Sequence, residues 1–346
     1  MALYDALADL PLEIEGTDRE RNARDTSSGF ERVTTTFSLR GRGVAGRGED
    51  VIYDADAHDA LETSFPDLAG EWTFDGFSAH LATRDLFPDA DPEREDFRHY
   101  RRWALESAAL DLALKQSKTS LAGVLDRETS PVRFVASTRL PEGDTARVER
   151  FRELDSTLEF KLDPTEEWSE ATFRTLRETE AVRVLDLKGY YEGTDVDQDP
   201  DVDLYERVFD LPGAVVEDPA LTEETEALVR SNRGRVSFDA PVTGVASIDE
   251  LPFEPAWLNV KPSRFGSVES LLETIEWAEA NGVECYGGGQ FELDVGRTHV
   301  QLLASLFYPD GPNDVAPPMY NDPEIPEHLP GSPLSAPANT AGLNWG

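Results

Sequence analysis

The feature that most constrains the fold is a regular alternation of short apolar runs with longer amphipathic segments, which begins near residue 131. Seven such runs follow one another, at residues 132–136, 158–160, 182–185, 214–216, 236–238, 258–260 and 283–286. Between them lie helical patterns with one polar face, for example at residues 166–180, 221–230 and 267–281. Short strands that alternate with helices are typical of a parallel sheet with helical crossovers.

A further stretch at Asp314 provides a candidate eighth strand. The alternation therefore predicts an α/β fold, a (β/α)7–8 barrel of the TIM type, over residues 131–322. Residues 1–130 differ in character. Segments at 33–40 and 51–54 flank Gly41, Gly43 and Gly46, which predicts a hairpin, and residues 97–116 repeat an apolar face at helical spacing. We expect residues 1–130 to form an α+β capping domain, and the proline-rich residues 323–346 to pack on the surface as an extension.

Five consecutive apolar runs are each followed by an ionisable residue. In chain order these residues are Lys161, Asp186, Glu217, Asp239 and Lys261. Because the carboxyl ends of parallel strands meet at the face where barrel enzymes build their sites, we expect these side chains to converge. Carboxylate oxygens are the ligands that Mg²⁺, and also Mn²⁺, prefers. The sequence therefore predicts a metal held by Asp186, Glu217 and Asp239, with a lysine on either side.

Such a site suits the removal of a proton next to a carboxylate. That proton is too weakly acidic for a lysine alone, and a divalent cation neutralises the negative charge of the enediolate that develops. A lysine acts as a base only when its pKa is lowered, which a nearby cation brings about. Lysine is also scarce here, since only five of the 32 basic residues are lysines: Lys115, Lys118, Lys161, Lys188 and Lys261. A chain that has largely dispensed with lysine keeps one where a compact, titratable ammonium is needed.

The composition excludes several other classes of protein. The net charge is −37, and its acids are spread along the chain, which favours adaptation to high salt over an acidic partner-binding surface. Nucleic acid is a poor partner for such a surface. No apolar run is long enough for a membrane span, and the N-terminus lacks the features of a signal peptide, so we expect a cytoplasmic protein. The single cysteine, Cys285, excludes an internal disulfide framework and a cysteine-based zinc site.

These residues stand in motifs that resemble those of the enolase superfamily, and the lysine pair is similar to that of its muconate-lactonizing-enzyme-like subgroup. The motifs are Ala104-Leu-Glu-Ser-Ala-Ala-Leu-Asp-Leu-Ala, Phe160-Lys161-Leu162, Asp186, Glu217-Asp218-Pro219, Asp239 and Asn259-Val260-Lys261-Pro262. The resemblance implies catalytic lysines on the second and sixth strands and Mg²⁺ on the third to fifth. It also implies an N-terminal lid, whose loops such as residues 25–30 close over a small carboxylate substrate. Barrels of this kind commonly assemble, so a homo-oligomer is an open expectation.

Three positions depart from the pattern of that family. Glu159 stands where the first lysine of a Lys-x-Lys pair is usual, Lys188 where asparagine is usual, and Ala240 where glutamate is usual. Residues i and i+2 share one side of a strand, so Lys188 either brings a third ammonium to the metal or forms a structural ion pair. No histidine stands near the seventh strand, which excludes the histidine base of the mandelate-racemase subgroup.

Other features near the seventh strand have two interpretations each. Gly287, Gly288 and Gly289 either form a tight turn, which we favour, or cradle an anionic group with their backbone N–H groups. Gln290 and Glu292 either touch the substrate or brace the lysines. His299 lies in a helical stretch, and a structural role is expected for it.

The leading hypothesis is an isomerase or lyase that acts on a small carboxylate by metal-assisted removal of an α-proton. Epimerisation, cycloisomerisation and an o-succinylbenzoate synthase-like dehydration all remain open. A sugar-acid dehydratase is the rival enzyme class, in which a second lysine or a tyrosine such as Tyr190 protonates the departing hydroxyl. The rival from another class is a catalytically silent enolase-like binding protein, against which the intact acids and both lysines speak.

Overall fold

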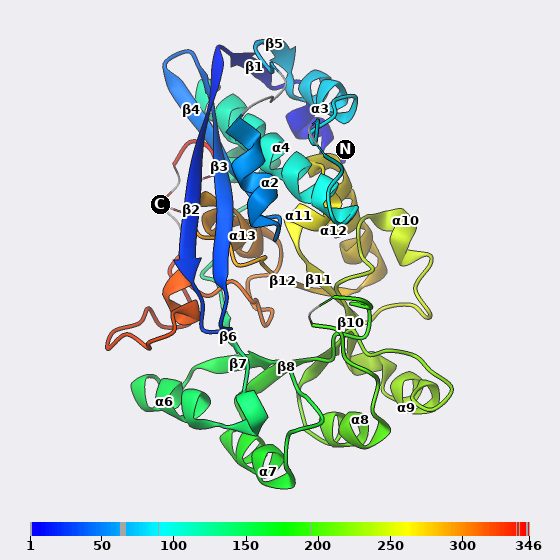
Figure 1. Cartoon of the computed structure of the whole chain (residues 1–346). Helices are drawn as coiled ribbons and strands as arrows, with labels where there is room; N and C mark the ends of the chain where they lie inside the picture. Colours follow the sequence, from blue (N-terminus) through cyan, green and yellow to red (C-terminus); the bar gives the residue numbers. More distant parts are fainter. Residues whose placement is uncertain are drawn as a thin grey trace.

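A computed structural model describes residues 2–62, 67–88, 90–194, 196–336, 338, 340–343 and 345, without the side chain of residue 62. An N-terminal part with antiparallel strands and one long helix lies against a C-terminal part built on a parallel sheet (Figure 1).

The parallel sheet contains all seven strands that the apolar runs predict. They are β6 (Val135–Thr138), β7 (Glu159–Leu162), β8 (Val182–Asp186), β9 (Val215–Glu217), β10 (Val236–Phe238), β11 (Trp257–Val260) and β12 (Glu284–Gly287). Their order in the sheet follows the chain without interruption, from β6 at one edge to β12 at the other. Every neighbouring pair is parallel. The prediction of an α/β fold on a parallel sheet is therefore confirmed.

The two edge strands are joined by a short segment in place of a regular eighth strand. Asn313 forms a bridge with Phe134, next to β6, and Asp314 forms one with Gly288, next to β12. The backbone N–H of Val135 donates to the carbonyl of Asn313 at 2.9 Å, and that of Asp314 donates to Gly287 at 2.8 Å. The strand expected near Asp314 is thus reduced to two bridged residues, which link both edges of the curled sheet.

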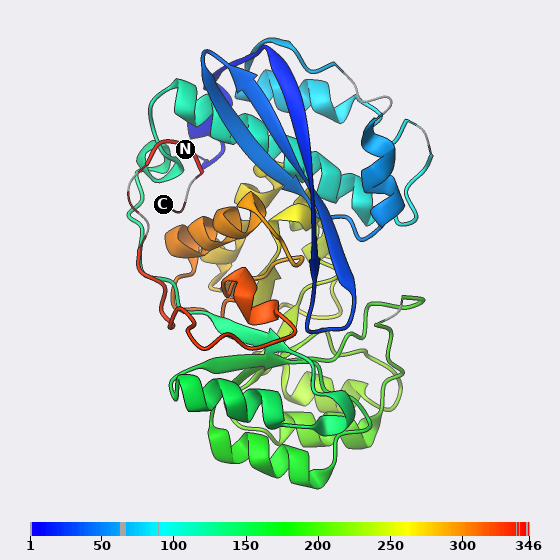
Figure 2. The same cartoon turned by 60° about the vertical axis from the view of Figure 1, so that its left-hand side comes forward.

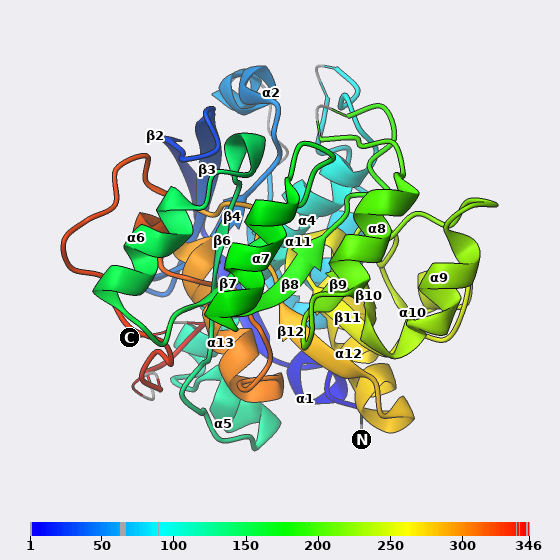
Figure 3. The same ribbon diagram turned by 90° about the horizontal axis from the view of Figure 1, so that it is seen from below.

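Helices follow most strands of the sheet. They are α6 (Ala146–Leu154), α7 (Glu170–Thr179), α8 (Val202–Phe209), α9 (Glu226–Ser231), α10 (Val245–Ile248), α11 (Pro262–Phe265), α12 (Val268–Asn281) and α13 (Val295–Phe307), with short 3₁₀ turns η2 (Pro141–Gly143), η3 (Arg233–Arg235) and η4 (Pro318–Asn321). The hydroxyls of Ser169 and Ser267 cap α7 and α12, which explains where these helices begin. Helices α6 to α9 succeed one another along the outer side of the strands (Figure 3).

The described residues of the N-terminal part form one three-stranded and one two-stranded antiparallel sheet. Its elements are α1 (Asp5–Ala8), β1 (Pro11–Ile14), β2 (Gly16–Asp25), β3 (Glu31–Gly41), β4 (Val44–Asp50), α2 (Ala55–Asp59), η1 (Ala60–Glu62), β5 (Gly70–Thr73), α3 (Phe74–Ala82), α4 (Asp96–Gln116) and α5 (Leu121–Leu125). The predicted helix at 97–116 is confirmed as α4. The hairpin is confirmed too, but its turn lies at Arg42 and Gly43, so that Gly46 belongs to β4 and residues 51–54 follow that strand.

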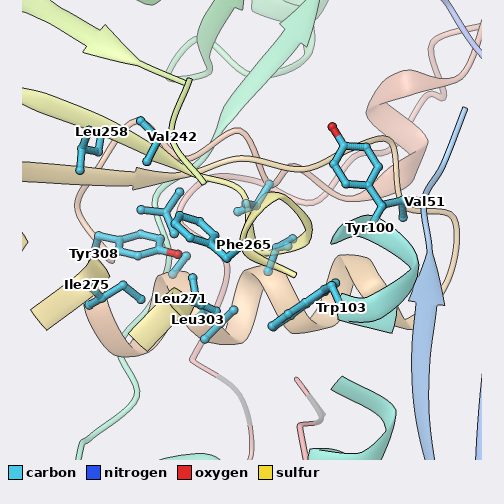
Figure 4. Packing of buried hydrophobic residues seen from close by; sticks show 14 of the residues in the cluster. Val51, Tyr100, Trp103, Val242, Leu258, Phe265, Leu271, Ile275, Leu303 and Tyr308 are labelled. Atoms are coloured by element: carbon cyan, nitrogen blue, oxygen red, sulfur yellow. The ribbon is translucent and has the colours of Figure 1, made fainter. Parts of the chain in front are cut away.

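Helix α4 lies directly on β4 because two glycines let the backbones approach. A Cβ atom at Gly46 would collide with the carbonyl of Ala108, and one at Gly48 with the carbonyl of Ala104. On another side, α4 packs against α11 and α12. Val51, Tyr100 and Trp103 therefore share one apolar core with residues such as Phe265 and Leu271 (Figure 4).

Helix α13 receives its N-terminal cap from the N-terminal part of the chain. The buried carboxylate of Glu49, at the end of β4, accepts three backbone N–H groups at 2.7–3.0 Å, those of Leu293, Asp294 and Gly296. Asp294 is the N-cap residue by position, but its side chain points away and accepts from Arg47 at 2.5 Å. An anionic cap also suits the positive end of the helix dipole. The two parts of the chain are thus joined by a helix cap as well as by a core.

The chain after η4 runs back along the molecule toward the N-terminal part (Figure 2). Leu334 forms a bridge with Val132, and Gly342 forms one with Ser120. The backbone N–H of Leu343 donates to Asp111 of α4 at 2.9 Å. Within the described residues, no helix is long and apolar enough to cross a bilayer.

Removal of the Glu49 carboxylate should destabilise the junction between the two parts. We expect Glu49→Ala to lower the free energy of unfolding by about 3 kcal/mol, because three buried N–H groups lose their acceptor. Urea denaturation at constant salt measures this change, and amide hydrogen exchange at residues 293, 294 and 296 should accelerate. Glu20→Ala, on exposed β2, is the control; an equal effect of both substitutions would contradict the assigned role of Glu49.

His299 of α13 gives the stability a defined pH dependence. Burial lowers the pKa of His299 to about 4, and its Nδ1 has no hydrogen-bond partner among the described residues. The unfolded chain, whose histidine titrates near 6.5, binds the proton more tightly, so stability is lost as the pH falls from 6.5 to 4.

We expect this residue to account for about 3 kcal/mol of the stability lost between pH 7 and pH 4. Chemical denaturation of the wild type and of His299→Gln at both pH values measures the difference. Parallel pH profiles for the two proteins would refute it.

Candidate active site

The five ionisable residues predicted at the strand ends all lie in the interior, with at most 6% exposure: Lys161, Asp186, Glu217, Asp239 and Lys261. Lys161 belongs to β7, while Asp186 and Glu217 are the last residues of β8 and β9 and lie opposite each other in the sheet. Asp239 and Lys261 directly follow β10 and β11. The parallel sheet therefore brings one charge from each of five neighbouring strands to its carboxyl end.

Lys161 lies between two of these carboxylates. Its Nζ is 2.5 Å from Oε1 of Glu217 and 3.1 Å from Oδ2 of Asp186, and 4.0 Å from Oδ2 of Asp314. Burial by itself lowers the pKa of Lys161, but the neighbouring carboxylates outweigh it and hold that pKa well above its usual value. Lys161 is thus a charged ammonium in this state of the site.

Lys261 occupies the other side of the site, on Asp239. Its Nζ lies 2.7 Å from Oδ2 of Asp239, and the hydroxyl of Tyr191 donates to the same oxygen at 2.9 Å. The buried guanidinium of Arg264 lies 3.2 Å from Oδ1 of Asp239 and donates to Tyr191 at 2.7 Å. Burial raises the pKa of Asp239, but Arg264 and Lys261 together lower it far below its usual range.

Glu217 is held by two neutral side chains besides Lys161. The hydroxyl of Tyr286 and the amide Nδ2 of Asn259 both donate to Oε2 of Glu217, the latter at 3.1 Å. Burial, and next the charge of Asp186, raise the pKa of Glu217 to about 8 despite the nearby ammonium. Among the three predicted ligands, Glu217 is thus the one whose charged form its surroundings favour least.

Asp218 supports the site by binding the backbone of Asp239 and Ala240. Its φ of 48° is in the left-handed region, and its two carboxylate oxygens accept the backbone N–H groups of Asp239 and Ala240, both at 2.8 Å. Burial and then the charge of Asp239 raise the pKa of Asp218 to about 7. Asp218 thus fixes the backbone from which the side chain of Asp239 projects.

Sequence reasoning missed Arg264, Tyr191 and Tyr286 as parts of the site. Asn259 and Tyr286 are opposite each other in the sheet, and Asn259 shares its strand side with Lys261. The alternation of side chains along β11 and β12 could therefore have placed Asn259 and Tyr286 in the site. Arg264 lies on α11 and Tyr191 lies in the loop after β8. No periodic pattern in the sequence points to either residue.

Lys188, the third lysine expected near the metal, contacts Asp186. Its ammonium is paired with Oδ2 of Asp186, and its backbone N–H donates to Oδ1 at 3.2 Å. Oδ1 of Asp163 lies 3.5 Å from the same ammonium. Lys188 thus lies in the site, and in an ion pair at the same time.

The predicted ligands fit a hard divalent cation in their chemistry. All three offer buried carboxylate oxygens. Oδ1 of Asp239 is in an ion pair with Arg264 at 3.2 Å but accepts no hydrogen bond in the part of the chain that the structure describes. Three ammonium groups lie against these carboxylates, those of Lys161, Lys188 and Lys261. Among the described residues, no three Asp, Glu, His or Cys side chains are grouped closely enough to hold an ion. The carboxylates are therefore arranged around ammonium groups in this structure.

Gly287, which ends β12, and the following Gly288 and Gly289 do not form the tight turn that we favoured. None of them has a positive φ, and Gly288 continues the strand by its bridge with Asp314. A Cβ atom on Gly288 would collide with Oδ1 of Asn259 and lie 2.8 Å from Cε of Lys261. Glycine is required there because the backbone passes directly against the catalytic candidate Lys261.

Gln290 and Glu292 lie in the loop between β12 and α13. Their side chains connect this loop to the N-terminal part and to α13. The Gln290 amide accepts from Tyr53 and donates to Tyr100, both at 3.0 Å. Glu292 accepts the backbone N–H of Gln290 at 2.6 Å and pairs with Arg297 at 3.1 Å. Among the described residues, neither side chain bonds to Lys161 or Lys261, so the expected bracing of the lysines is not seen.

Two other candidates lie outside the cluster. Glu159 is paired with Arg133 and lies 3.5 Å from Arg183, so its carboxylate is held apart from the ammonium of Lys161. Tyr190 packs against Phe238 with ring centroids 6.1 Å apart, and it is the next residue, Tyr191, that bonds to Asp239. The suggestion of Tyr190 as an acid is therefore not supported by its position.

The tip of the β2–β3 hairpin reaches the loop that follows β12. The ring of Phe30 lies 5.6 Å from that of Phe291, and the backbone N–H of Ser27 donates to Asn321 at 2.7 Å. Arg24 and Asp322 form an ion pair at 2.6 Å beside this contact. Residues 25–30, the expected lid loop, thus extend from the N-terminal part to the C-terminal one (Figure 2).

Solved structures with the same fold include three enzymes. Muconate lactonizing enzyme from Pseudomonas putida is 19% identical with a TM-score of 0.70, and muconate cycloisomerase from Pseudomonas fluorescens is 18% identical with a TM-score of 0.70; each match covers 96% of both chains. A dipeptide epimerase from Methylococcus capsulatus, complexed with a Mg ion, is 18% identical with a TM-score of 0.66 over 86% of this chain and 88% of its own. No curated protein matches the chain.

Two family descriptions match nearly the whole chain. The C-terminal domain of the domain of unknown function DUF8230 matches residues 128–322, and the N-terminal domain of the same family matches residues 5–124. The chain therefore belongs to the DUF8230 family, and its fold is that of the muconate lactonizing enzymes.

Proposed function

We propose that this protein is a Mg²⁺-dependent enzyme that removes and returns a proton next to the carboxylate of a small substrate. Lys161 and Lys261 are the acid–base pair, and Asp186, Glu217 and Asp239 hold the cation. The observation that carries the proposal is the placement of one buried ammonium on each side of the carboxylates: Lys161 on Asp186 and Glu217, Lys261 on Asp239.

A bound divalent cation would supply the charge that stabilises the enediolate form of the substrate carboxylate. The ability of Lys161 to act as a base follows from its own surroundings. Burial lowers its pKa, while Asp186 and Glu217 raise it. If a bound cation balanced the charge of those carboxylates, burial would dominate and lower the pKa of Lys161, which would let Lys161 accept a proton.

Lys261 would face the substrate from the other side of the site, since it is paired with Asp239 while Lys161 is paired with Asp186 and Glu217. A pair of lysines so placed can remove a proton from one face of a carbon and return it to the opposite face, which is an epimerisation. After the proton is removed, a group on the neighbouring carbon can instead leave. Loss of a ring carboxylate is the reverse of a cycloisomerisation, and loss of a hydroxyl group is a dehydration. The fold is shared with muconate cycloisomerase and with a dipeptide epimerase bound to a Mg ion, which supports this range of reactions.

The test is the exchange of substrate α-protons with deuterated solvent. Dipeptides, N-acyl amino acids and acid sugars are incubated with the protein, Mg²⁺ and high salt in D₂O, and exchange is followed by NMR. We expect the double variant Lys161→Ala/Lys261→Ala to lose exchange by about 10²–10⁴-fold. The control Lys118→Ala, at an exposed lysine, should retain it.

Calorimetric titration with Mg²⁺ tests the ligands separately. Asp186→Asn and Glu217→Gln should each weaken binding by at least about tenfold, because each removes a charged ligand. Binding of a carboxylate without any proton exchange, in wild type and variants alike, would support a silent binding protein and overturn the proposed chemistry.

A further inference from the structure

Lys188 engages both oxygens of a predicted metal ligand. Its ammonium is paired with Oδ2 of Asp186, the oxygen that Nζ of Lys161 also approaches at 3.1 Å, and its backbone N–H donates to Oδ1. A cation bound by Asp186 must approach these same oxygens. Because like charges at such short distance repel, the ammonium of Lys188 and a divalent cation compete for one carboxylate.

The backbone at Lys188 and Gly189 is packed closely against a neighbouring loop. Its φ of 56° places it in the left-handed region. The next residue, Gly189, donates its backbone N–H to the carbonyl of Asp218 at 2.8 Å, and a Cβ atom on Gly189 would collide with Ala220. The loop after β8, which carries Lys188, is therefore packed against the loop after β9.

A second carboxylate stands next to the same ammonium. Oδ1 of Asp163, just after β7, lies 3.5 Å from Nζ of Lys188, and the ring of Tyr191 lies 5.5 Å away. Asp163 is partly exposed and is also paired with Arg139 at 3.4 Å. The ammonium of Lys188 thus has two acceptors: a fully buried carboxylate of the site and a carboxylate at its rim.

We propose that Lys188 is an internal counter-ion that competes with the divalent cation for Asp186, and that Asp163 keeps the ammonium paired when the cation holds Asp186. This inference rests on the proposed metal site. It assigns to Lys188 a control of cation affinity, with no part in proton transfer. Until a cation binds, the ammonium of Lys188 offsets the cost of the buried Asp186 carboxylate.

Titration calorimetry with MgCl₂ at fixed salt tests this inference on the full chain. We expect Lys188→Met to bind Mg²⁺ at least about tenfold more tightly than wild type. Lys188→Asn, whose residue type tolerates a positive φ, should do the same if the methionine variant folds poorly. Asp163→Asn should weaken binding several-fold, because Lys188 then keeps Asp186 as its remaining carboxylate partner.

The double variant Lys188→Met/Asp163→Asn separates this competition from a general charge effect. It should bind as tightly as Lys188→Met alone, since the effect of Asp163 acts through Lys188. Arg139→Gln is the matched control, because it removes a positive charge from the same Asp163 without touching Asp186. We expect it to change the dissociation constant less than about twofold at high salt.

The outcomes distinguish the two proposals. Unchanged or weaker binding in both Lys188 variants, with binding lost in Asp186→Asn, overturns the role of Lys188 and leaves the metal site standing. An effect of Asp163→Asn that persists in the Lys188→Met background also overturns that role. Absence of Mg²⁺ binding in the wild type and in every variant overturns both proposals.

Discussion

The mutual neutralisation of buried charges at the carboxyl end of the parallel sheet is the interaction on which this structure depends. The strands place Asp186, Glu217 and Asp239 at the carboxyl end of the sheet, where they are buried. Burying a single carboxylate without a partner costs several kcal/mol. The ammonium groups of Lys161 and Lys261 offset that cost from either side. The balance is uneven, because the pKa values of the two aspartates are lowered while that of Glu217 is raised to about 8. The fold therefore contains one carboxylate that the protein itself leaves partly uncompensated.

The uneven neutralisation of these buried charges points to a functional role for them. Buried ion pairs can often be replaced by apolar side chains without loss of stability, so a charged interior of this kind is more typical of a functional site than of a structural one. The use of lysine points the same way. Arginine forms nearly all the exposed ion pairs of the described residues, whereas three of the five lysines, Lys161, Lys188 and Lys261, are paired with the carboxylates of the site. An ammonium can lose its proton when its surroundings change, and a guanidinium cannot.

The sequence predicted the parts of the fold whose residues repeat with a period, and it failed where contacts come from distant segments. The seven strands and α4 were predictable from apolar runs and helical spacing, and the strand-end charges followed from them. Strand β2 was missed because its residues are polar and largely exposed, so no alternation marks it. The direction of Glu159 depends on Arg133 and Arg183, which flank it only once the sheet has formed. The places of Arg264 and Tyr191 depend likewise on loop conformations that no local pattern encodes.

The Glu49 carboxylate at the head of α13 has a consequence for the history of the chain. The two matching family descriptions divide the sequence near residue 126, and a division of that kind suggests modules that could be exchanged. Helix α13, however, begins on an acceptor that belongs to the other module, and the adjoining Asp294 is held there by Arg47. A recombinant that joined this C-terminal half to a foreign N-terminal half would inherit a helix without its cap. The two halves are thus constrained to evolve together, whatever substrate the site between the lysines comes to accept.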